Sequence, residues 1–173
     1  MKRADEQQAL RALQAALAAE HAAVYGYGVV GGRITEARRT EVRAAYDAHR
    51  ARRDALAREV RGLGTEPVAA SAAYALPFAV PDSPTAVRLA AELEDRVAGV
   101  CSDLVRATTG ARRREAAGAL REAAVRAVRW RGGSVAFPGL AERTGTDTDT
   151  GTDTGDAGPS VSPPVSGTAR PTV

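Results

Sequence analysis

The sequence predicts an all-α protein, a four-helix bundle in which two helical hairpins are joined by one long crossover. Two observations support this prediction. Four long segments place apolar residues at the three- and four-residue spacing of amphipathic helices, and no run of useful length alternates as a strand would. The segments are linked in pairs by a few residues, whereas more than twenty residues separate the second segment from the third.

The first predicted helix runs from about residue 5 to residue 30. Asp5 and Gln8 have the spacing of a capping box, in which two side chains satisfy free N–H groups of the first helical turn. Gly31 and Gly32 follow the last apolar residue, and glycine commonly ends a helix because it readily adopts a positive φ.

The second predicted helix runs from about residue 36 to residue 61. Thr35 is its expected N-cap, and Gly62 is expected to end it. Because the link from the first helix is so short, the two helices are predicted to be antiparallel neighbours.

The second hairpin is predicted in residues 83–131. Its first helix begins at Ser83, an expected N-cap followed by Pro84 at the first helical position, and ends near Thr108. Its second helix starts after Gly110 and ends before a Gly-Gly pair. The short link again predicts antiparallel neighbours.

The segment between the hairpins is GLGTEPVAASAAYALPFAVPDS, residues 62–83. It is long for a loop in a compact domain. It is also long enough to return along helices of this length, which rise about 1.5 Å per residue. Two hairpins joined by such a crossover form the arrangement of ferritin-like bundles.

The C-terminal residues 141–173 are rich in Thr, Asp, Gly and Pro and contain no aromatic residue. Such a segment buries too little apolar surface to offset its ordering entropy, so a disordered tail is predicted. The predicted organisation is therefore a bundle in residues 1–140 and a tail in residues 141–173. Residues 137–140, which include Phe137, are expected to fold back onto the end of the bundle near Trp130.

Charge and hydropathy limit the classes of function. The N-terminus has no apolar segment typical of a signal peptide, and the longest uncharged run is too short to span a bilayer, so a cytoplasmic protein without a membrane contact is predicted. Arginines are frequent in residues 36–61, but acidic residues are interleaved at salt-bridging spacings. The tail is acidic, so nucleic-acid binding is not the predicted function.

Three polar residues interrupt the apolar stripes that face the predicted core. At about 100° of rotation per residue, Glu20 lies close to the centre of the stripe of the first helix. His49 lies at the centre of the second stripe, and Glu94 lies within the third. Each residue is near the midpoint of its helix, and the midpoints of antiparallel helices share one layer. The three side chains are therefore expected to meet in the core.

A buried carboxylate without a partner is costly, so these side chains must satisfy one another, bind water or hold an ion. The sequence also offers Cys101, two turns beyond Glu94, for which burial as a small hydrophobe is expected. No catalytic triad, phosphate loop or dinucleotide fingerprint is visible, so the sequence indicates no particular reaction and leaves enzymatic activity undecided.

Features spread over the four helices carry a family resemblance. They are Glu20-His21 with Tyr25 and Tyr27, the stretch AYDAHRARRDAL with His49, the linker AYALP, Glu94, and the closing WR and FPGL. On these residues the chain, from about residue 8 to residue 140, resembles the ferritin-like domain of unknown function found in high-GC bacteria.

The resemblance implies a carboxylate site for two iron or manganese ions. That site takes a Glu from each of two helices and a Glu-x-x-His from each of the other two. Glu20 and Glu94 match the two single glutamates, and His49 matches one histidine, but Tyr46 replaces its glutamate partner. Helix four offers only Glu122, which lacks the histidine and faces outward. A complete site for two metal ions is therefore not expected.

Two functions remain open. The first is a structural or interaction role for a bundle whose degenerate metal site has become a buried Glu20–His49–Glu94 cluster, with no cofactor. The second is a single Fe, Mn or Zn ion held by the same three residues, with redox or metal-handling activity.

The first helix also suggests a partner. One of its faces carries only small residues, and small residues spaced four apart allow another backbone to approach closely. A homodimer through this face is predicted, and two-fold symmetry is the commonest arrangement. The alternative is that the crossover or residues 137–140 of the same chain cover it. The face consists of Ala12, Ala15, Ala19, Ala22 and Gly26.

Overall fold

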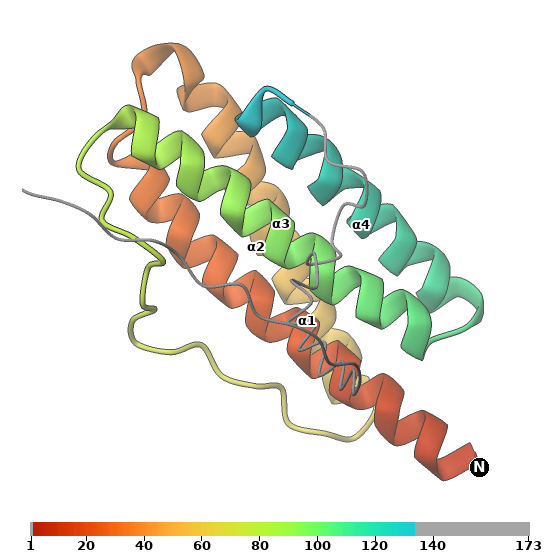
Figure 1. The fold of residues 1–173 in the computed structure, drawn as a ribbon. Coiled ribbons are helices and arrows are strands. Elements are labelled where there is room, and N and C mark those ends of the chain that lie inside the picture. Colours follow the sequence, from red (N-terminus) through yellow and green to blue (C-terminus); the bar gives the residue numbers. More distant parts are fainter. Residues whose placement is uncertain (1, 134–173) are drawn as a thin grey trace, which may run out of the picture. The chain divides into compact units, whose positions relative to one another are not determined.

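The computed structural model describes residues 2–133, and Figure 1 shows their arrangement. These residues form four α-helices and one short 3-10 helix, and no strand occurs among them. The predicted all-α four-helix fold is therefore confirmed. The elements are α1 (Lys2–Gly31), η1 (Glu36–Arg38), α2 (Arg39–Gly62), α3 (Ser83–Ala107) and α4 (Gly110–Arg131).

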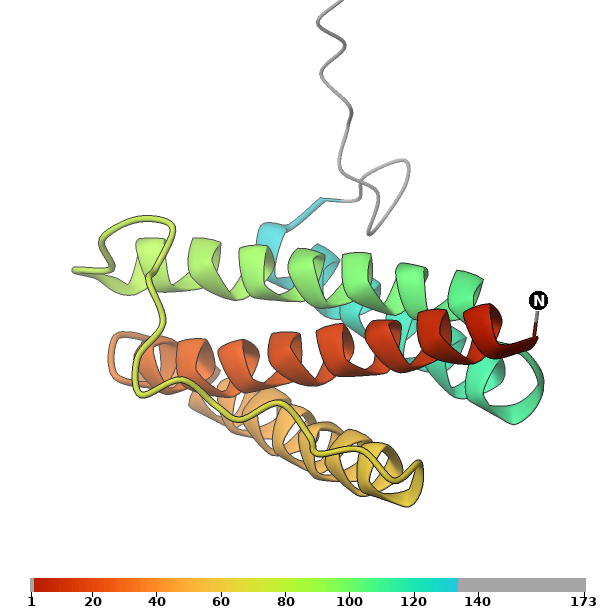
Figure 2. The same ribbon diagram turned by 90° about the horizontal axis from the view of Figure 1, so that it is seen from below.

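The helices pair as the loop lengths predicted. α1 packs against α2 within the first hairpin, and α3 packs against α4 within the second. The hairpins meet where α1 lies beside α3. The crossover returns along the length of α1, so α3 runs in the same direction as α2 (Figures 1 and 2). This direction places the midpoints of all four helices in one layer.

Three predicted caps differ from the structure. Thr35 precedes the 3-10 helix η1 without a side-chain cap hydrogen bond, and α2 itself begins only at Arg39. α3 is capped by Asp82 rather than Ser83, because the Asp82 carboxylate accepts the Thr85 N–H at 3.0 Å and completes a capping box. α1 begins at Lys2, before the predicted box at Asp5, so Asp5 lies within the first turn. A carboxylate in that position still interacts favourably with the helix dipole.

The core divides into two large-residue ends and a small-residue middle. At one end Tyr27, Leu89 and Trp130 are buried together, and at the other Leu13 and Leu17 belong to a second cluster. The middle cluster is mostly alanine and valine from α1, α3 and α4. Small side chains allow close helix approach, and this brings polar groups of different helices within hydrogen-bonding distance.

The crossover is held on the outer side of α1. The Gln14 side-chain amide donates to the Glu66 carbonyl at 2.7 Å and accepts from the Val68 N–H at 2.8 Å. The rings of Tyr25 and Tyr74 lie 5.4 Å apart. The crossover therefore contacts the side of α1 that carries Gln14 and Tyr25, about a third of a turn from the small-residue face. Cover of the small-residue face by the crossover stays a prediction.

Two sequence-based predictions concern residues outside the range 2–133. The disordered tail of residues 141–173 and the contact of residues 137–140 with Trp130 lie outside the described residues. Among residues 2–133, no helix combines the length and the apolar character needed to cross a membrane.

Candidate functional site

The structure brings the three predicted polar residues together. Glu20, His49 and Glu94 have at most 1% of their surface exposed. The His49 Nδ1 atom lies 2.6 Å from Glu20 Oε2, and its Nε2 atom lies 3.1 Å from Glu94 Oε1. The imidazole therefore lies between two carboxylates that come from α1 and α3.

Arg126 of α4 joins this cluster, which the sequence did not predict. Its Nε donates to Glu94 Oε1 at 2.7 Å, and only 17% of its side chain is exposed. Arg126 lies off the apolar stripe of α4, a position that is typical of a solvated residue. A long arginine stem can, however, turn inward from the flank of a helix and carry its charge to a buried partner.

Tyr27 and Trp130 extend the cluster toward the end of the bundle. The Tyr27 hydroxyl donates to Glu94 Oε1 at 2.5 Å and accepts the Trp130 indole N–H at 2.9 Å. The Tyr27 ring also stacks on the His49 ring, with centroids 5.1 Å apart. Both aromatic residues are buried with their polar atoms satisfied, as buried Tyr and Trp usually are.

Arg52 closes the cluster on the solvent side. Its guanidinium lies 3.5 Å from Glu20 Oε1 and 2.6 Å from Glu122 Oε2. Glu122 is exposed, as predicted, but it links α4 to α2 through this arginine. We call Glu20, His49, Glu94, Arg126, Tyr27, Trp130 and Arg52 together the charge network.

The charge network favours the charged forms of His49 and Glu94. Burial alone would lower the pKa of His49, but the hydrogen bonds that the ring donates to Glu20 and Glu94, together with their negative charges, outweigh burial and raise it. Burial opposes ionisation of Glu94 as well, yet His49 and then Arg126 lower its pKa below the usual range. Burial and the neighbouring Glu94 charge raise the pKa of Tyr27, so its hydroxyl remains a donor.

The arrangement does not fit one metal ion held by the three predicted ligands. The two carboxylates bind opposite nitrogens of the same imidazole, so the ring separates them and no position is close to all three. Glu94 Oε1 is also engaged by the Arg126 guanidinium. Within residues 2–133, no group of three or more His, Cys, Asp or Glu side chains is arranged to hold a metal ion.

Two buried atoms of the network have no hydrogen-bond partner. They are Glu94 Oε2 and Arg126 Nη2, which belong to directly paired side chains. An orphaned acceptor and an orphaned donor of this kind are usually satisfied by buried water. They are the clearest unused polar groups in the described core.

A cavity of about 330 Å³ reaches the network from the other half of the bundle. Glu20, Arg52 and Cys101 line it together with several alanines. Burial, followed by the Glu20 charge, raises the pKa of Cys101 to about 12, so its thiol stays protonated. Cys101 is therefore the small buried hydrophobe that the sequence predicted, not a nucleophile.

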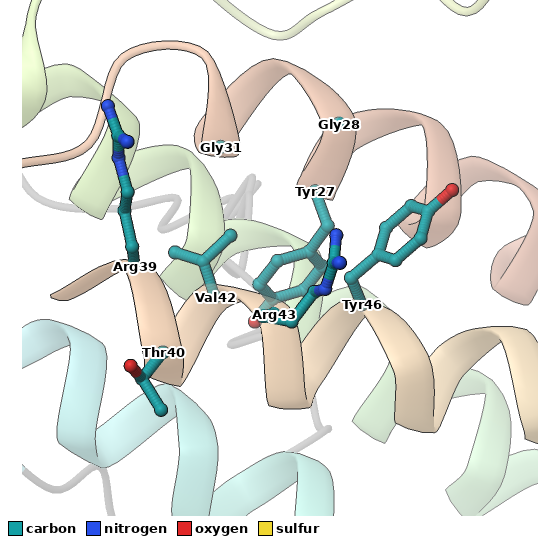
Figure 3. A pocket seen from close by; sticks show the side chains of 8 residues that line it. All are labelled: Tyr27, Gly28, Gly31, Arg39, Thr40, Val42, Arg43 and Tyr46. Carbon is teal, nitrogen blue, oxygen red and sulfur yellow. The ribbon is translucent and has the colours of Figure 1, made fainter. Parts of the chain in front are cut away.

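A larger cavity, of about 630 Å³, opens between α1 and α2. Gly28 and Gly31 form its α1 side, while Arg39, Arg43 and Tyr46 come from α2 (Figure 3). Glu20, His49 and Glu94 do not line it, and it meets the network only at Tyr27. It is therefore separate from the buried charges.

Residues 12–142 match the family described as a domain of unknown function, DUF4439. The chain belongs to this family. All seven residues of the charge network, from Glu20 to Trp130, lie within the matched residues 12–142.

This DUF4439 chain is also similar to a solved structure, the crystal structure of a conserved hypothetical protein, rv2844, from Mycobacterium tuberculosis. The two chains are 36% identical, with a TM-score of 0.71, and the match covers 72% of this chain and 96% of the other. No curated protein matches the chain.

Proposed function

We propose that this DUF4439 domain is a ferritin-like bundle whose metal centre has been replaced by the charge network, and that its role is structural or in protein interaction. The observation that carries the proposal is the position of His49, with one carboxylate on each ring nitrogen. An imidazolium and a guanidinium supply the positive charge that two buried carboxylates require.

The network has one member from each helix at its centre. Glu20 comes from α1, His49 from α2, Glu94 from α3 and Arg126 from α4. This connection matters most for α2, whose backbone packs closely on α1 alone among the four helices. Buried polar networks can select one arrangement of helices over others, and we assign this task to the network.

The second candidate function is a mononuclear metal site at the same residues. One observation favours it, since Glu94 Oε2 is buried and has no partner. Binding of an ion by Glu94 and Glu20 together would require a carboxylate to leave the His49 ring. This candidate function therefore predicts that metal binding breaks at least one hydrogen bond between His49 and a carboxylate, so the charge network would not stay intact.

Metal analysis of protein purified without chelator separates the two functions. We expect less than about 0.1 equivalent of any transition metal, and no gain in thermal stability on adding Fe(II), Mn(II) or Zn(II). The matched control is the variant His49→Gln, which removes the imidazole ring as a metal ligand and keeps a polar side chain at this position. Stoichiometric metal that disappears in His49→Gln would establish the metal site and reject the structural proposal.

A further inference from the structure

Along one edge of the bundle, between α2 and α4, the helices are joined by the Arg52–Glu122 and Arg112–Glu59 ion pairs but not by close backbone packing. The backbones of α2 and α4 stay more than 8 Å apart, measured between Cα atoms, along their whole length. The other three edges of the bundle, α1–α2, α1–α3 and α3–α4, are all closely packed. Packed helices usually have axes 8–10 Å apart, and Cα atoms lie about 2.3 Å from each axis, so their nearest Cα atoms approach to well under 8 Å. Since no Cα atoms of α2 and α4 come this close, the two helices do not pack as neighbours.

A groove of about 700 Å³ occupies this edge beside the charge network. Ala37 of η1 and Ala44 and Ala45 of α2 line one side, and Val125 and Trp130 of α4 line the other. Ala45 and Trp130 are buried and form the floor, whereas Ala44 and Val125 are exposed. Val125 is 44% exposed, an unusual position for a large apolar residue when the edge of a bundle is closed. We call this feature the α2–α4 groove. Its alanine wall is too shallow to fill the space between the helices.

The charged residues of the groove leave an excess of positive charge. Both acidic residues that line it are already paired, Glu41 with Arg38 at 2.8 Å and Glu122 with Arg52 at 2.6 Å. Arg121 and Arg129 also line it, and neither forms an ion pair within residues 2–133.

We propose that the α2–α4 groove binds an acidic amphipathic helix of a partner protein. An apolar stripe would meet the alanine wall and Val125, and flanking Glu or Asp side chains would pair with Arg121 and Arg129. The α4 wall from Arg121 to Trp130 is about 14 Å long at 1.5 Å per residue, which suits two to three helical turns. A second copy of the same face would bring like charges together, so charge favours a different, acidic partner.

Trp130 supplies a built-in probe, because it lines the groove and is the single tryptophan of the chain. The full chain is titrated with a synthetic tryptophan-free peptide helix that has a leucine face and glutamate flanks. The control peptide has lysine in place of each glutamate. We expect the acidic peptide to change Trp130 fluorescence with a Kd of about 10–100 μM, and the basic peptide to bind at least about tenfold more weakly.

Two variants test the groove itself. Ala44→Arg places a long charged side chain on the exposed alanine wall, and we expect it to weaken peptide binding by about tenfold or more. Arg121→Glu with Arg129→Glu should have a comparable effect through charge. The matched controls are Ala117→Arg and Arg114→Glu, which lie exposed on α4 away from the groove and should leave binding unchanged.

Three results would overturn the proposal. The first is no binding of the acidic peptide at about 1 mM, and the second is equal binding of the acidic and basic peptides. The third is binding that depends on Arg121 and Arg129 but not on Ala44, which would mean attraction of any polyanion. The metal analysis does not bear on these measurements, so this proposal and the proposed function can fail separately.

Discussion

Glu94 Oε1 accepts hydrogen bonds from three other helices, through Tyr27, His49 and Arg126. Removal of one partner leaves the other groups buried with an unpaired donor or charge, and this usually costs more than the bond itself contributes.

Tyr27→Phe should lower the free energy of unfolding by about 1–3 kcal/mol. The change removes one donor to Glu94 and leaves the buried Trp130 indole N–H without its acceptor. Urea unfolding followed by circular dichroism measures the loss. The matched control is Tyr46→Phe, whose hydroxyl has no hydrogen-bond partner in the network, and its effect should be within about 0.5 kcal/mol. Equal effects of the two changes would contradict this account.

Stability should depend on pH through His49 and Glu94. The pKa of His49 is raised above its ordinary value of 6.5, so its contribution is complete below pH 6.5 and is lost as the pH rises through the folded pKa. The pKa of Glu94 is lowered below 4.5, so its contribution is present above pH 4.5 and is lost as the pH falls through the folded pKa.

These two groups therefore give greatest stability between pH 4.5 and 6.5, with losses on either side. Urea unfolding at a series of pH values measures the dependence. In His49→Gln the decline at high pH should disappear, whereas the decline at low pH should remain in reduced form. An unchanged high-pH decline in this variant would show that other groups cause it.

At the scale of the elements, the approach of α1 to α3 depends on one glycine. A Cβ atom added at Gly26 would lie 2.5 Å from a methyl group of Leu93, which is buried in the core. A Cβ atom at Gly28, two residues later on the same helix, would meet nothing within 4 Å. Gly26, part of the small-residue face assigned to a homodimer, therefore faces α3 of its own chain.

Gly26→Ala should destabilise the protein by about 1–3 kcal/mol, because Leu93 must move in a packed core. Gly28→Ala should stabilise it by about 0.5–1 kcal/mol, because alanine loses less backbone freedom in a helix and the space is open. Thermal and urea unfolding of the two variants test this pair. A stabilising Gly26→Ala would mean that α1 and α3 are less closely packed.

At the scale of the whole molecule, the homodimer remains a prediction. Gly26 is turned toward α3 of its own chain, so the free part of the small-residue face centres on the exposed Ala15. In light scattering at about 100 μM, a dimer should become a monomer in Ala15→Arg. An unmodified chain that is already a monomer at this concentration would reject the dimer.

The sequence by itself determined the fold and the candidate centre. Loop lengths specified which helices pair, because a short link leaves a helix no neighbour except the one before it. Helical periodicity placed Glu20, His49 and Glu94 inside, because an α-helix repeats its faces every 3.6 residues regardless of what surrounds it. Both properties are local along the chain, so they can be derived without knowing the tertiary contacts.

Only the tertiary structure decided which atoms of these residues meet. Arg126 lies on the flank of its helix, where its long side chain can extend either to solvent or to Glu94, and the helical period does not distinguish these outcomes. The binding of both His49 nitrogens depends on ring orientation, and the open α2–α4 edge depends on how far two helices separate. These features follow from packing between distant segments, which no local pattern in the sequence records.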